Sequence, residues 1–595
     1  MPIYTAPQRE FQFVVKEYLE LGRFVDVAPY ADFSPDMFDA FLAGAARMCE
    51  GVAQPLNQSG DAEGCRFEEG KVTTPTGFKQ AYRQFADGGW VGLAFDPAYG
   101  GQGLPRVMAE IFNEMLCSAN MAFSGYIELS EAVFSAISAH GDEAQKRLYL
   151  PKLGDGSWTG AMALTEPQAG SDLRLVRTRA TQQADGSFRI DGSKVFITNA
   201  EHDLAENIVH LVLARTPGAP EGSGGLSLFI VPKFELQADG TPGTRNGVHC
   251  LSIEHKMGLR AAPTGVILYE GAVGHLLGGL NQGLKAMFTM VNDARLGVAL
   301  QGLGQAEVAS QNALRYARER LQGRSLGSGG SAAPVPLLAH PDVRKMLMTM
   351  CSFTEAARGL GLWIALQIDL AASHPDPAER HKAAGLIALL TPVVKAHFTD
   401  AGFEAANLAL QCFGGYGYVR ETGVEQFVRD VRITQIYEGT NGIQALDLVR
   451  RKLGAEEGGG WMEFSRLVQR SIDAAAERTS LSAPADAMNT ALGHLREASR
   501  WMQAQAASGD AVAAAAGATE YLRVFGLVAL GWVWLDFARI STSRIDHGGD
   551  DVDFYQRKVR VANFFIQRVL PQTEWLSRLA RLGASEVMAL SEEAL

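Results

Sequence analysis

Apolar side chains follow two different spacings along the chain. From about residue 6 to residue 156 they recur every three or four positions, as at Phe11, Val15 and Leu19, which places them on one face of a helix. Between about residues 158 and 279 they form short runs rich in β-branched and aromatic residues, which are typical of strands. Helical spacing then resumes. The pattern predicts a helical segment, a small β segment and a second helical segment.

Two Gly-rich stretches interrupt the later part of the chain. Residues 327–336 contain too much Gly and Pro for a helix and indicate a surface connection. Residues 454–460 are typical of a linker, and amphipathic helical patterns follow it to Leu595. We therefore expect a mainly α fold with a central β-barrel domain, a helical bundle and an additional C-terminal helical domain. The expected domains are 1–157, 158–280, 281–453 and 454–595.

Turn and core signals add detail to this outline. Residues 184–186 and 191–192 contain Asp-Gly pairs, which favour hairpin turns between strands. The most apolar stretch, Val524–Leu535, is closed by Arg523 and Asp536 and is shorter than the ~20 residues that span a bilayer. We expect it to be a buried core helix, and we expect no membrane association.

Composition narrows the class of protein. A chain of 595 residues with 47% hydrophobic and 20% charged residues is long enough for several domains and has ordinary globular composition. The six cysteines lack metal-type spacing, and neither an HExxH nor a GxSxG pattern occurs. We therefore expect no metal site, no disulfide framework and no hydrolase of the simplest kind. The N-terminus lacks the basic and apolar regions of a signal peptide, so we expect a cytoplasmic protein.

The run Arg429–Thr440 places one carboxylate among apolar neighbours. Glu438 follows Ile436 and Tyr437, which suit a buried turn, and Gly439 permits a sharp exit before a capped helix. Burial beside apolar groups disfavours the charged form of a carboxylate and strengthens it as a base that can take a proton from carbon. An ordinary Glu at a helix end, accepting backbone N–H bonds, is the alternative for so short a motif.

A polar loop follows the first expected strand of the β segment. Residues 161–164 are apolar, and Pro167 keeps Glu166 extended. Gly170 and Ser171 then expose backbone N–H groups and a hydroxyl, which can satisfy the polar edge of a planar ring or a phosphate. A strand followed by a plain turn would give the same local pattern.

Four motifs in one order carry a resemblance to a known family. They are Leu164–Asp172, Lys194–Asn199, Gln411–Gly417 and Ile436–Thr440. Together with the helical, β, helical order they resemble the acyl-CoA dehydrogenase family of flavoproteins, over about residues 40–453. The opening at residues 4–7 and the extra helical tail resemble the larger subgroup that includes 3-(methylthio)propanoyl-CoA dehydrogenases.

The resemblance implies FAD as the cofactor and an acyl-CoA thioester as the substrate. It makes Glu438 the catalytic base that removes the α-proton, while the β-hydride passes to N5 of FAD and a trans-2-enoyl thioester is formed. The backbone N–H of Glu438 would help to stabilise the negative charge that develops on the thioester oxygen. Ser171 and Gly439 would also contact the substrate. The residues expected around the flavin are Met162, Leu164, Thr165, Gly170, Ser171, Phe196, Ile197, Thr198, Thr440 and Gln444.

The helix after the β segment carries two arginines that the resemblance assigns to different ligands. Asn292 and Arg295 would bind the CoA end of the substrate, and Arg320 would bind the FAD pyrophosphate of a neighbouring subunit. Residues 295 and 320 would lie about 37 Å apart on a continuous helix, too far to touch one compact ligand. Without the other motifs, both would be ordinary surface arginines.

The glycine-rich motif Gln411–Gly417 also depends on a second subunit. Gly allows another chain or a dinucleotide to approach closely, although a lone cluster of this kind would simply end a helix. The resemblance implies a homodimer or larger homo-oligomer. The residues expected to meet the adenosine half of the partner's FAD are Gln411, Gly414 and Gly415.

The resemblance further implies electron-transfer flavoprotein as the electron acceptor. An acyl-CoA oxidase, which passes electrons to oxygen, shares the base and the extended length and is one alternative. A DNA-associated flavoprotein on the same scaffold is an alternative of another class, but the formal charge of -12 counts against it and we expect no nucleic acid partner. No residue indicates the length or branching of the acyl chain.

Overall fold

The chain forms two compact units in a computed structural model that describes residues 2–326, 333–454, 459–548 and 550–594, the side chains of 289–293 excepted. One unit is Gly44–Gly297. The other combines Met1–Ala43 with Val298–Leu595. The first residues of the chain therefore fold with the later helices rather than with the segment that follows them in sequence.

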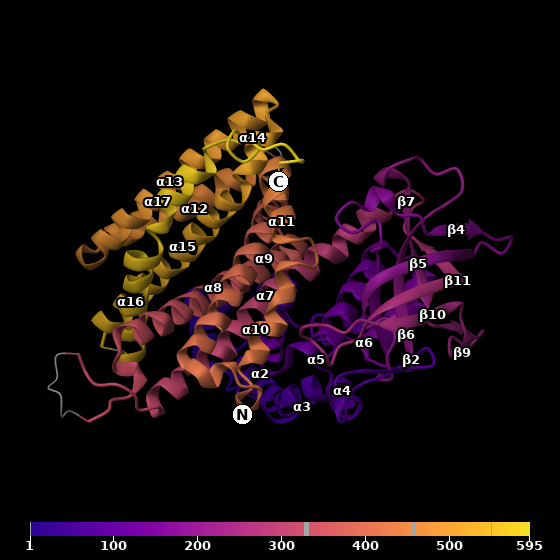
Figure 1. Cartoon of the computed structure of the whole chain (residues 1–595), viewed down its shortest axis with the longest axis horizontal. Coiled ribbons are helices and arrows are strands. Elements are labelled where there is room, and N and C mark those ends of the chain that lie inside the picture. The colour runs from indigo at the N-terminus through magenta and orange to yellow at the C-terminus, as the bar shows by residue number, and fades with distance from the viewer. Residues whose placement is uncertain (1, 327–332, 455–458, 549, 595) are drawn as a thin grey trace. The chain divides into compact units, whose positions relative to one another are not determined.

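The unit Gly44–Gly297 is built around a seven-stranded sheet (Figure 1). Strand β7 pairs with both β11 and β6, so that β11, β5, β4, β6 and β7 close into a ring. The ring confirms the expected central β-barrel. The seven strands are β3 (Trp158–Ala163), β4 (Arg179–Gln182), β5 (Phe188–Thr198), β6 (Asn207–Arg215), β7 (Leu226–Pro232), β10 (Val248–Ile253) and β11 (Thr264–Leu277).

Two hydrophobic cores hold this unit together. One includes Ile190, Val212 and Phe229 and lies among the strands of the sheet. The other packs the sheet against helices α5 (Arg106–His140) and α6 (Glu143–Gly154). Because β6 and β7 are buried on both faces, their sequences are mostly apolar runs, interrupted by His210 and Ser227, and could be recognised as strands. The remaining helices and short strands of the unit are α3 (Asn57–Glu63), α4 (Phe78–Asp87), β1 (Arg66–Glu68), β2 (Lys71–Thr73), β8 (Phe234–Leu236) and β9 (Pro242–Arg245).

The structure corrects two details of the sequence outline. The N-terminal segment is not entirely helical, because β1 and β2 form a hairpin whose Val72 and Phe67 pack on the core of the sheet. The turn expected at residues 184–186 is present between β4 and β5, but residues 191–192 lie inside β5. Gly192 is required there by a close approach: an added Cβ would lie 2.5 Å from the Thr178 hydroxyl oxygen.

Among the described residues of the second unit, all regular elements are helices, apart from one isolated bridge between Leu321 and Pro336. Its longest helices are α8 and α9, and α7 enters it from the β unit. Its helices are α1 (Gln8–Gln12), α8 (Pro341–Ser373), α9 (Pro377–Phe413), α10 (Glu425–Val431), α11 (Asn441–Asp447), α12 (Gly459–Ala476), α13 (Ser482–Ser508), α14 (Ala511–Ala516), α15 (Ala518–Asp546), α16 (Val552–Phe564) and α17 (Gln572–Ala580). Two more helices cross between the units in sequence, α2 (Pro35–Met48) and α7 (Gly283–Glu319).

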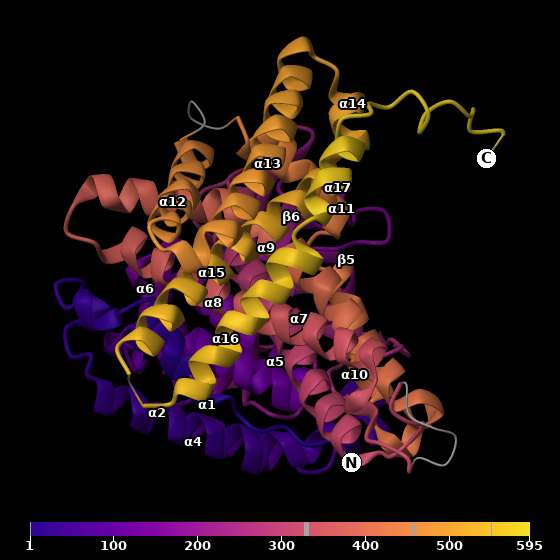
Figure 2. The same cartoon turned by 90° about the vertical axis from the view of Figure 1, so that its left-hand side faces the viewer.

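Helix α15 is the centre of the C-terminal bundle. It packs against α12, α13, α16 and α17 and also against α8 and α9, and Figures 1 and 2 both show α13 and α17 alongside it. Among the described helices it is the one long and apolar enough to cross a membrane, but 83% of its most apolar window is buried inside the protein. This burial confirms that Val524–Leu535 belongs to a core helix.

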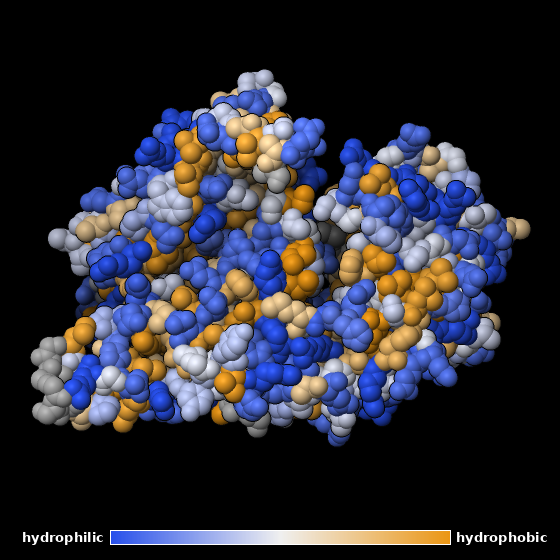
Figure 3. All heavy atoms as spheres, viewed as in Figure 1, coloured by the Kyte–Doolittle hydropathy of each residue, from blue (hydrophilic) through white to orange (hydrophobic). Residues whose placement is uncertain are grey.

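The surface carries scattered hydrophobic residues. In Figure 3 they gather where Figure 1 draws β10 and β11, and Leu251 on β10 is 51% exposed. Apolar atoms make up more than half of an ordinary protein surface, so we assign no role to this group of residues.

Candidate active site

Glu438 lies in a short turn between the 3-10 helix Arg432–Gln435 and α11. Its backbone is left-handed, with φ 54°, and Gly439 follows with φ 87°. A bulky side chain is strained in this region, and such residues persist where the surrounding structure holds them for a function. Glu438 is half-buried, but Ile436 is 48% exposed. The expected apolar burial of the turn is therefore wrong for Ile436, and polar contacts hold the turn instead.

Buried donors fix the backbone around Glu438. Lys395 of α9 donates to the carbonyl oxygen of Gly439 at 2.9 Å and to Oδ1 of Asn441 at 3.0 Å. Gln444 of α11 donates to the carbonyl oxygens of Glu438 and Gly439 at 3.2 and 3.3 Å. The backbone is therefore held from the carbonyl of Glu438 onward by two side chains, Lys395 and Gln444.

The start of α11 closes the turn as the sequence predicts. Thr440 is the N-cap, and its hydroxyl accepts the backbone N–H of Ile443 at 3.3 Å. Gly439 is required by space as well as by its φ, because an added Cβ would lie 2.6 Å from Nε2 of Gln444. Glu438, Gly439, Thr440 and Gln444 are thus brought together.

The first two motifs meet in the β unit. The backbone N–H of Val195 donates to the carbonyl of Thr165 at 2.9 Å, which joins strand β5 to the loop after β3. Lys194, fully buried, donates to the carbonyl of Leu164 at 3.0 Å and to Oε1 of Glu166 at 2.9 Å. The sequence did not single out Lys194 and Glu166 as a pair, although each lies inside a recognised motif.

The surface beside this junction has the properties of a ring-binding wall. Phe196 has φ 58° and is 64% exposed, an unusual state for a strand phenylalanine. Gly170 has open space around it, and Ser171 is exposed. Three residues after Phe196, Asn199 is buried, and its amide has no hydrogen-bond partner among the described residues. The other expected flavin residues are half-buried or buried in the same strands and loop: Met162, Leu164, Thr165, Ile197 and Thr198.

A pocket of about 490 Å³ lies in the helical unit, and Glu438 is not one of the residues that line it. It brings together all four residues that the sequence assigned to the dinucleotide of a partner, namely Arg320, Gln411, Gly414 and Gly415. Added Cβ atoms at either glycine would meet nothing within 4 Å. The guanidinium carbon of Arg320 lies 5.7 Å from the ring centre of Tyr416.

Two aromatic residues of this pocket were not anticipated. Tyr316 lies one helical turn before Arg320 and stacks on Phe413, with ring centres 4.2 Å apart. Tyr416 is 56% exposed within the glycine run. Their positions in the sequence could have indicated them, because Tyr316 lies one helical turn before Arg320 and Tyr416 lies among the glycines. A basic group, open glycines and flat rings together suit a dinucleotide.

The two residues assigned to CoA lie on α7, which is continuous over Gly283–Glu319. Arg295 is 7% exposed, so it is not the solvated surface arginine of the alternative interpretation. The side chain of Asn292 lies outside the described residues.

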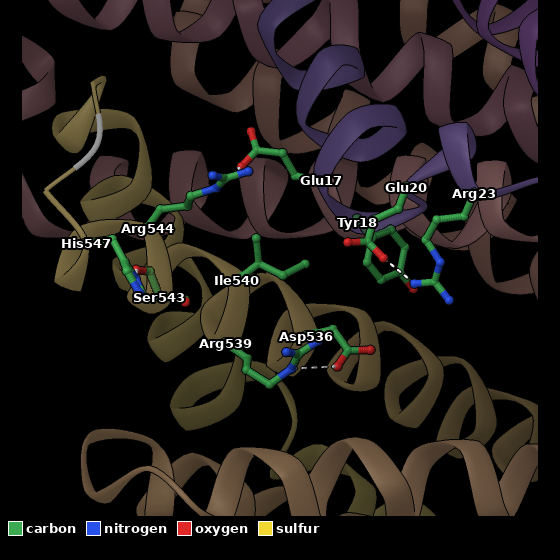
Figure 4. A pocket seen from close by; sticks show the side chains of 10 residues that line it. All are labelled: Glu17, Tyr18, Glu20, Arg23, Asp536, Arg539, Ile540, Ser543, Arg544 and His547. Carbon is green, nitrogen blue, oxygen red and sulfur yellow. Dashed lines mark hydrogen bonds and ion pairs between the residues drawn. The ribbon is translucent and has the colours of Figure 1, made fainter. Parts of the chain in front are cut away.

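A larger pocket of about 630 Å³ lies between the N-terminal segment and α15 (Figure 4). Its charged side chains pair with one another, as Arg544 does with Glu17 at 2.9 Å. None of the expected site residues lines it, so we assign it no chemical role. Its lining residues are Glu17, Tyr18, Glu20, Arg23, Asp536, Arg539, Ile540, Ser543, Arg544 and His547.

The residues present fit the FAD that the resemblance implies. An exposed phenylalanine face, an open glycine and hydroxyl groups at the end of β5 and the loop after β3 suit a flat polar-edged ring. An unpartnered buried amide follows the same strand. The arginine pocket has the cation and the open backbone that a pyrophosphate needs.

Comparison with known families covers nearly the whole chain. Residues 39–157, 161–272 and 281–453 match the N-terminal, middle and C-terminal domain models of acyl-CoA dehydrogenase. Residues 465–591 match the model described as acetyl-CoA dehydrogenase C-terminal like.

Full-length relatives and solved structures agree with these matches. The chain is 42% identical over 575 residues to the 3-methylmercaptopropionyl-CoA dehydrogenase of Ruegeria pomeroyi, covering 95% of this chain and 96% of the relative. It is 33% identical to the broad-specificity linear acyl-CoA dehydrogenase FadE5 of Mycobacterium tuberculosis, covering 100% of both.

Among solved structures, Caenorhabditis elegans ACDH-11 in complex with C11-CoA matches with a TM-score of 0.79 at 20% identity, covering 98% of this chain and 95% of that one. The Bacillus anthracis acyl-CoA dehydrogenase complexed with FAD matches with a TM-score of 0.74 at 21% identity, covering 92% and 88%. At these identities the two structures establish the fold.

Proposed function

Because this chain belongs to the acyl-CoA dehydrogenase family, we propose that Glu438 is the base of its reaction. The chain is an FAD-dependent oxidoreductase that converts an acyl-CoA thioester to the trans-2-enoyl-CoA. One observation carries the choice of base: Glu438 has a left-handed backbone, and the buried donors Lys395 and Gln444 hold the carbonyl groups of Glu438 and Gly439. Strain of ~1–3 kcal/mol at a non-glycine residue points to a function for its side chain.

The chemistry divides between FAD and the residues of this chain. FAD, when bound, accepts the β-hydrogen together with its electron pair. The carboxylate of Glu438 takes the α-proton and holds it as the carboxylic acid. The backbone N–H of Glu438 stabilises the negative charge on the thioester oxygen, because a fixed donor aimed at developing charge lowers the barrier.

We assign the flavin ring to the junction of β3 and β5. Phe196 supplies the flat wall, and the hydroxyls of Thr165, Ser171 and Thr198 supply polar contacts. Support comes from the exposed ring of Phe196 and from the hydrogen bond that joins the two motifs. On the substrate side, Arg295 and Asn292 take the CoA end, because a guanidinium can fork onto phosphate oxygens.

We assign the pocket around Arg320 to the FAD of a second copy of this chain, so that the enzyme works as a homodimer or larger homo-oligomer. Support comes from the four expected residues that line one pocket of about 490 Å³. We also propose the division into domains 1–157, 158–280, 281–453 and 454–595 and a cytoplasmic location.

We propose electron-transfer flavoprotein as the electron acceptor. A solved chain whose title describes the electron transferring flavoprotein of Acidaminococcus fermentans matches with a TM-score of 0.58 at 27% identity, over 71% of this chain. Reduction of electron-transfer flavoprotein by the acyl-CoA-reduced enzyme, without peroxide, is the expected result. Stoichiometric peroxide formation in air would instead identify an acyl-CoA oxidase.

The function is tested by anaerobic mixing with a panel of acyl-CoAs, with the flavin absorbance as the readout. The panel begins with 3-(methylthio)propanoyl-CoA, the substrate named for the relative at 42% identity. We expect Glu438→Gln to keep its yellow cofactor and to lose bleaching by every member of the panel. Glu421→Gln, at an exposed glutamate of the same unit, is the matched control and should bleach normally. Undiminished bleaching in Glu438→Gln would contradict the assignment.

A further inference from the structure

Lys395 is a fully buried lysine in the middle of α9. Its neighbours on the helix, Val394 and Phe398, are buried apolar residues. A lysine is almost never buried completely unless its charge is bound by other groups, because moving an ammonium out of water is costly. The position therefore has a role that an apolar residue would not fill.

The ammonium of Lys395 binds the backbone on the far side of Glu438. Nζ lies 2.9 Å from the carbonyl oxygen of Gly439 and 3.0 Å from Oδ1 of Asn441. One cation thus holds two oxygens that flank Thr440. Hydrogen bonds from a charged donor are roughly twice as strong as neutral ones.

Asn441 is itself anchored to α9. Its amide nitrogen donates to Thr399 Oγ1 at 2.9 Å and to Asp400 Oδ1 at 2.7 Å. The first residues of α11 are therefore fastened to one face of a long helix through a lysine and an asparagine. Glu438 precedes this fastened segment directly.

The left-handed conformation of Glu438 needs such a fastening. Its φ of 54° is unfavourable for a residue with a side chain. Lys395 fixes the peptide after Gly439, and Gln444 fixes the carbonyl of Glu438 at 3.2 Å. If the lysine were removed, the turn could relax toward ordinary backbone angles and carry the carboxylate away from its position.

We propose that Lys395 is a positioning residue for proton abstraction: by clamping Gly439 and Asn441 it holds the Glu438 carboxylate in the geometry that reaches the α-hydrogen. The inference rests on the assignment of Glu438 as the base.

The test is Lys395→Met in the flavin-loaded enzyme. Methionine keeps most of the length and the apolar character of the buried side chain and removes the ammonium group, with its charge and its donors. We expect turnover per bound flavin to fall about 100-fold, as a misplacement of about 1 Å can cause, while KM for the acyl-CoA is unchanged. The isotope effect with α-deuterated acyl-CoA should rise, because proton removal becomes the slow step. Lys382→Met, near the exposed start of the same helix, is the control and should match the wild type.

Other outcomes overturn the proposal in recognisable ways. A merely stabilising lysine would lower the flavin content but leave turnover per flavin and the isotope effect unchanged. Lys395→Gln, which retains a neutral donor, is measured if the methionine variant loses its flavin. Loss of flavin in both variants would show that Lys395 only stabilises the fold.

If Glu438→Gln is inactive and Lys395→Met is fully active, only this inference fails. If Glu438→Gln still bleaches, the proposed function fails first.

Discussion

Glu166 shows how one carboxylate can hold a cofactor loop. Burial alone raises the pKa of Glu166, but the charge of Lys194 and the Thr178 hydroxyl outweigh it and lower the pKa to about 2. The carboxylate also accepts the backbone N–H of Arg177 at 2.7 Å. The loop before Gly170 is therefore tied to β5 and to the chain that follows it.

This ion pair predicts a specific loss of stability in acid. The pKa of Glu166 in the folded protein lies below its ordinary value of 4.5. The contribution of its charge to the free energy of unfolding is therefore present above pH 4.5 and is lost as the pH falls toward 2. The lowering of the pKa corresponds to a contribution of about 3 kcal/mol. We expect the free energy of unfolding of the wild type to fall more steeply below pH 4.5 than that of Glu166→Gln, measured by denaturant titration. Parallel pH curves for the two proteins would contradict this account of the loop.

Single residues also mark the limit of sequence reasoning. Glu438 and the loop around Ser171 could be found because each lies in a short motif with its own chemistry. Lys395 could not, because the spacing of α9 indicates only that the position faces inward. The contact between Lys395 and the turn of Glu438 depends on how α9 and α11 pack, which the sequence does not show.

At the scale of elements, the N-terminal segment is tied to the C-terminal helices by Lys558 of α16. This lysine is fully buried, lies 2.5 Å from Glu355 of α8 and also pairs with Glu10 of α1. Its Nζ lies 5.1 to 5.7 Å from the centres of four aromatic rings. Cation–π attraction and two ion pairs thus join three helices at one atom.

We expect Lys558→Met to destabilise the helical unit. Arg557 also pairs with Glu355 and Glu10, so Lys558→Met removes one of the two cations that these buried carboxylates share. Breaking a buried ion pair costs up to about 3–5 kcal/mol. Thermal and denaturant unfolding should both show the loss. Lys345→Met, at an exposed lysine of α8, is the matched control and should change stability by less than about 0.5 kcal/mol. Equal stability of the two variants would show that the buried lysine does not join these helices.

Helices and strands could be predicted where burial of their apolar side chains determined the sequence pattern. Strands β6 and β7 are apolar on both faces, and α15 is apolar around its circumference, so their patterns were direct evidence of burial. The hairpin of β1 and β2 was not recognised because each strand has three residues and only Val72 is fully buried. Its stability comes from packing on a sheet distant in sequence, which local patterns do not record.

At the scale of the whole molecule, the proposed use of the Arg320 pocket involves a second copy of the chain. The pocket around Arg320 has the residues for a pyrophosphate, and Arg320 itself is exposed in one chain. We expect Arg320→Gln to weaken FAD binding about ten- to hundred-fold, since a hydrogen bond to a charged group contributes about 1.5–3 kcal/mol. Flavin fluorescence during equilibrium dialysis measures this.

The neighbouring exposed arginine supplies the control. Arg318→Gln, also near the end of α7, should bind FAD like the wild type. Retained flavin should also fall on dilution of the wild type if the pocket is completed by a second copy. Equal FAD affinity of the two arginine variants would rule out this use of the pocket.

Hydrogen exchange at the α-carbon of the substrate reports whether the carboxylate of Glu438 removes the α-proton. The wild-type holoenzyme is incubated in D2O, without an electron acceptor, with an acyl-CoA that it binds, and deuterium at the α-carbon is followed by NMR. We expect rapid α-exchange in the wild type and in Glu421→Gln, and loss of exchange in Glu438→Gln with its flavin still bound. Exchange at the wild-type rate in Glu438→Gln would show that another group is the base.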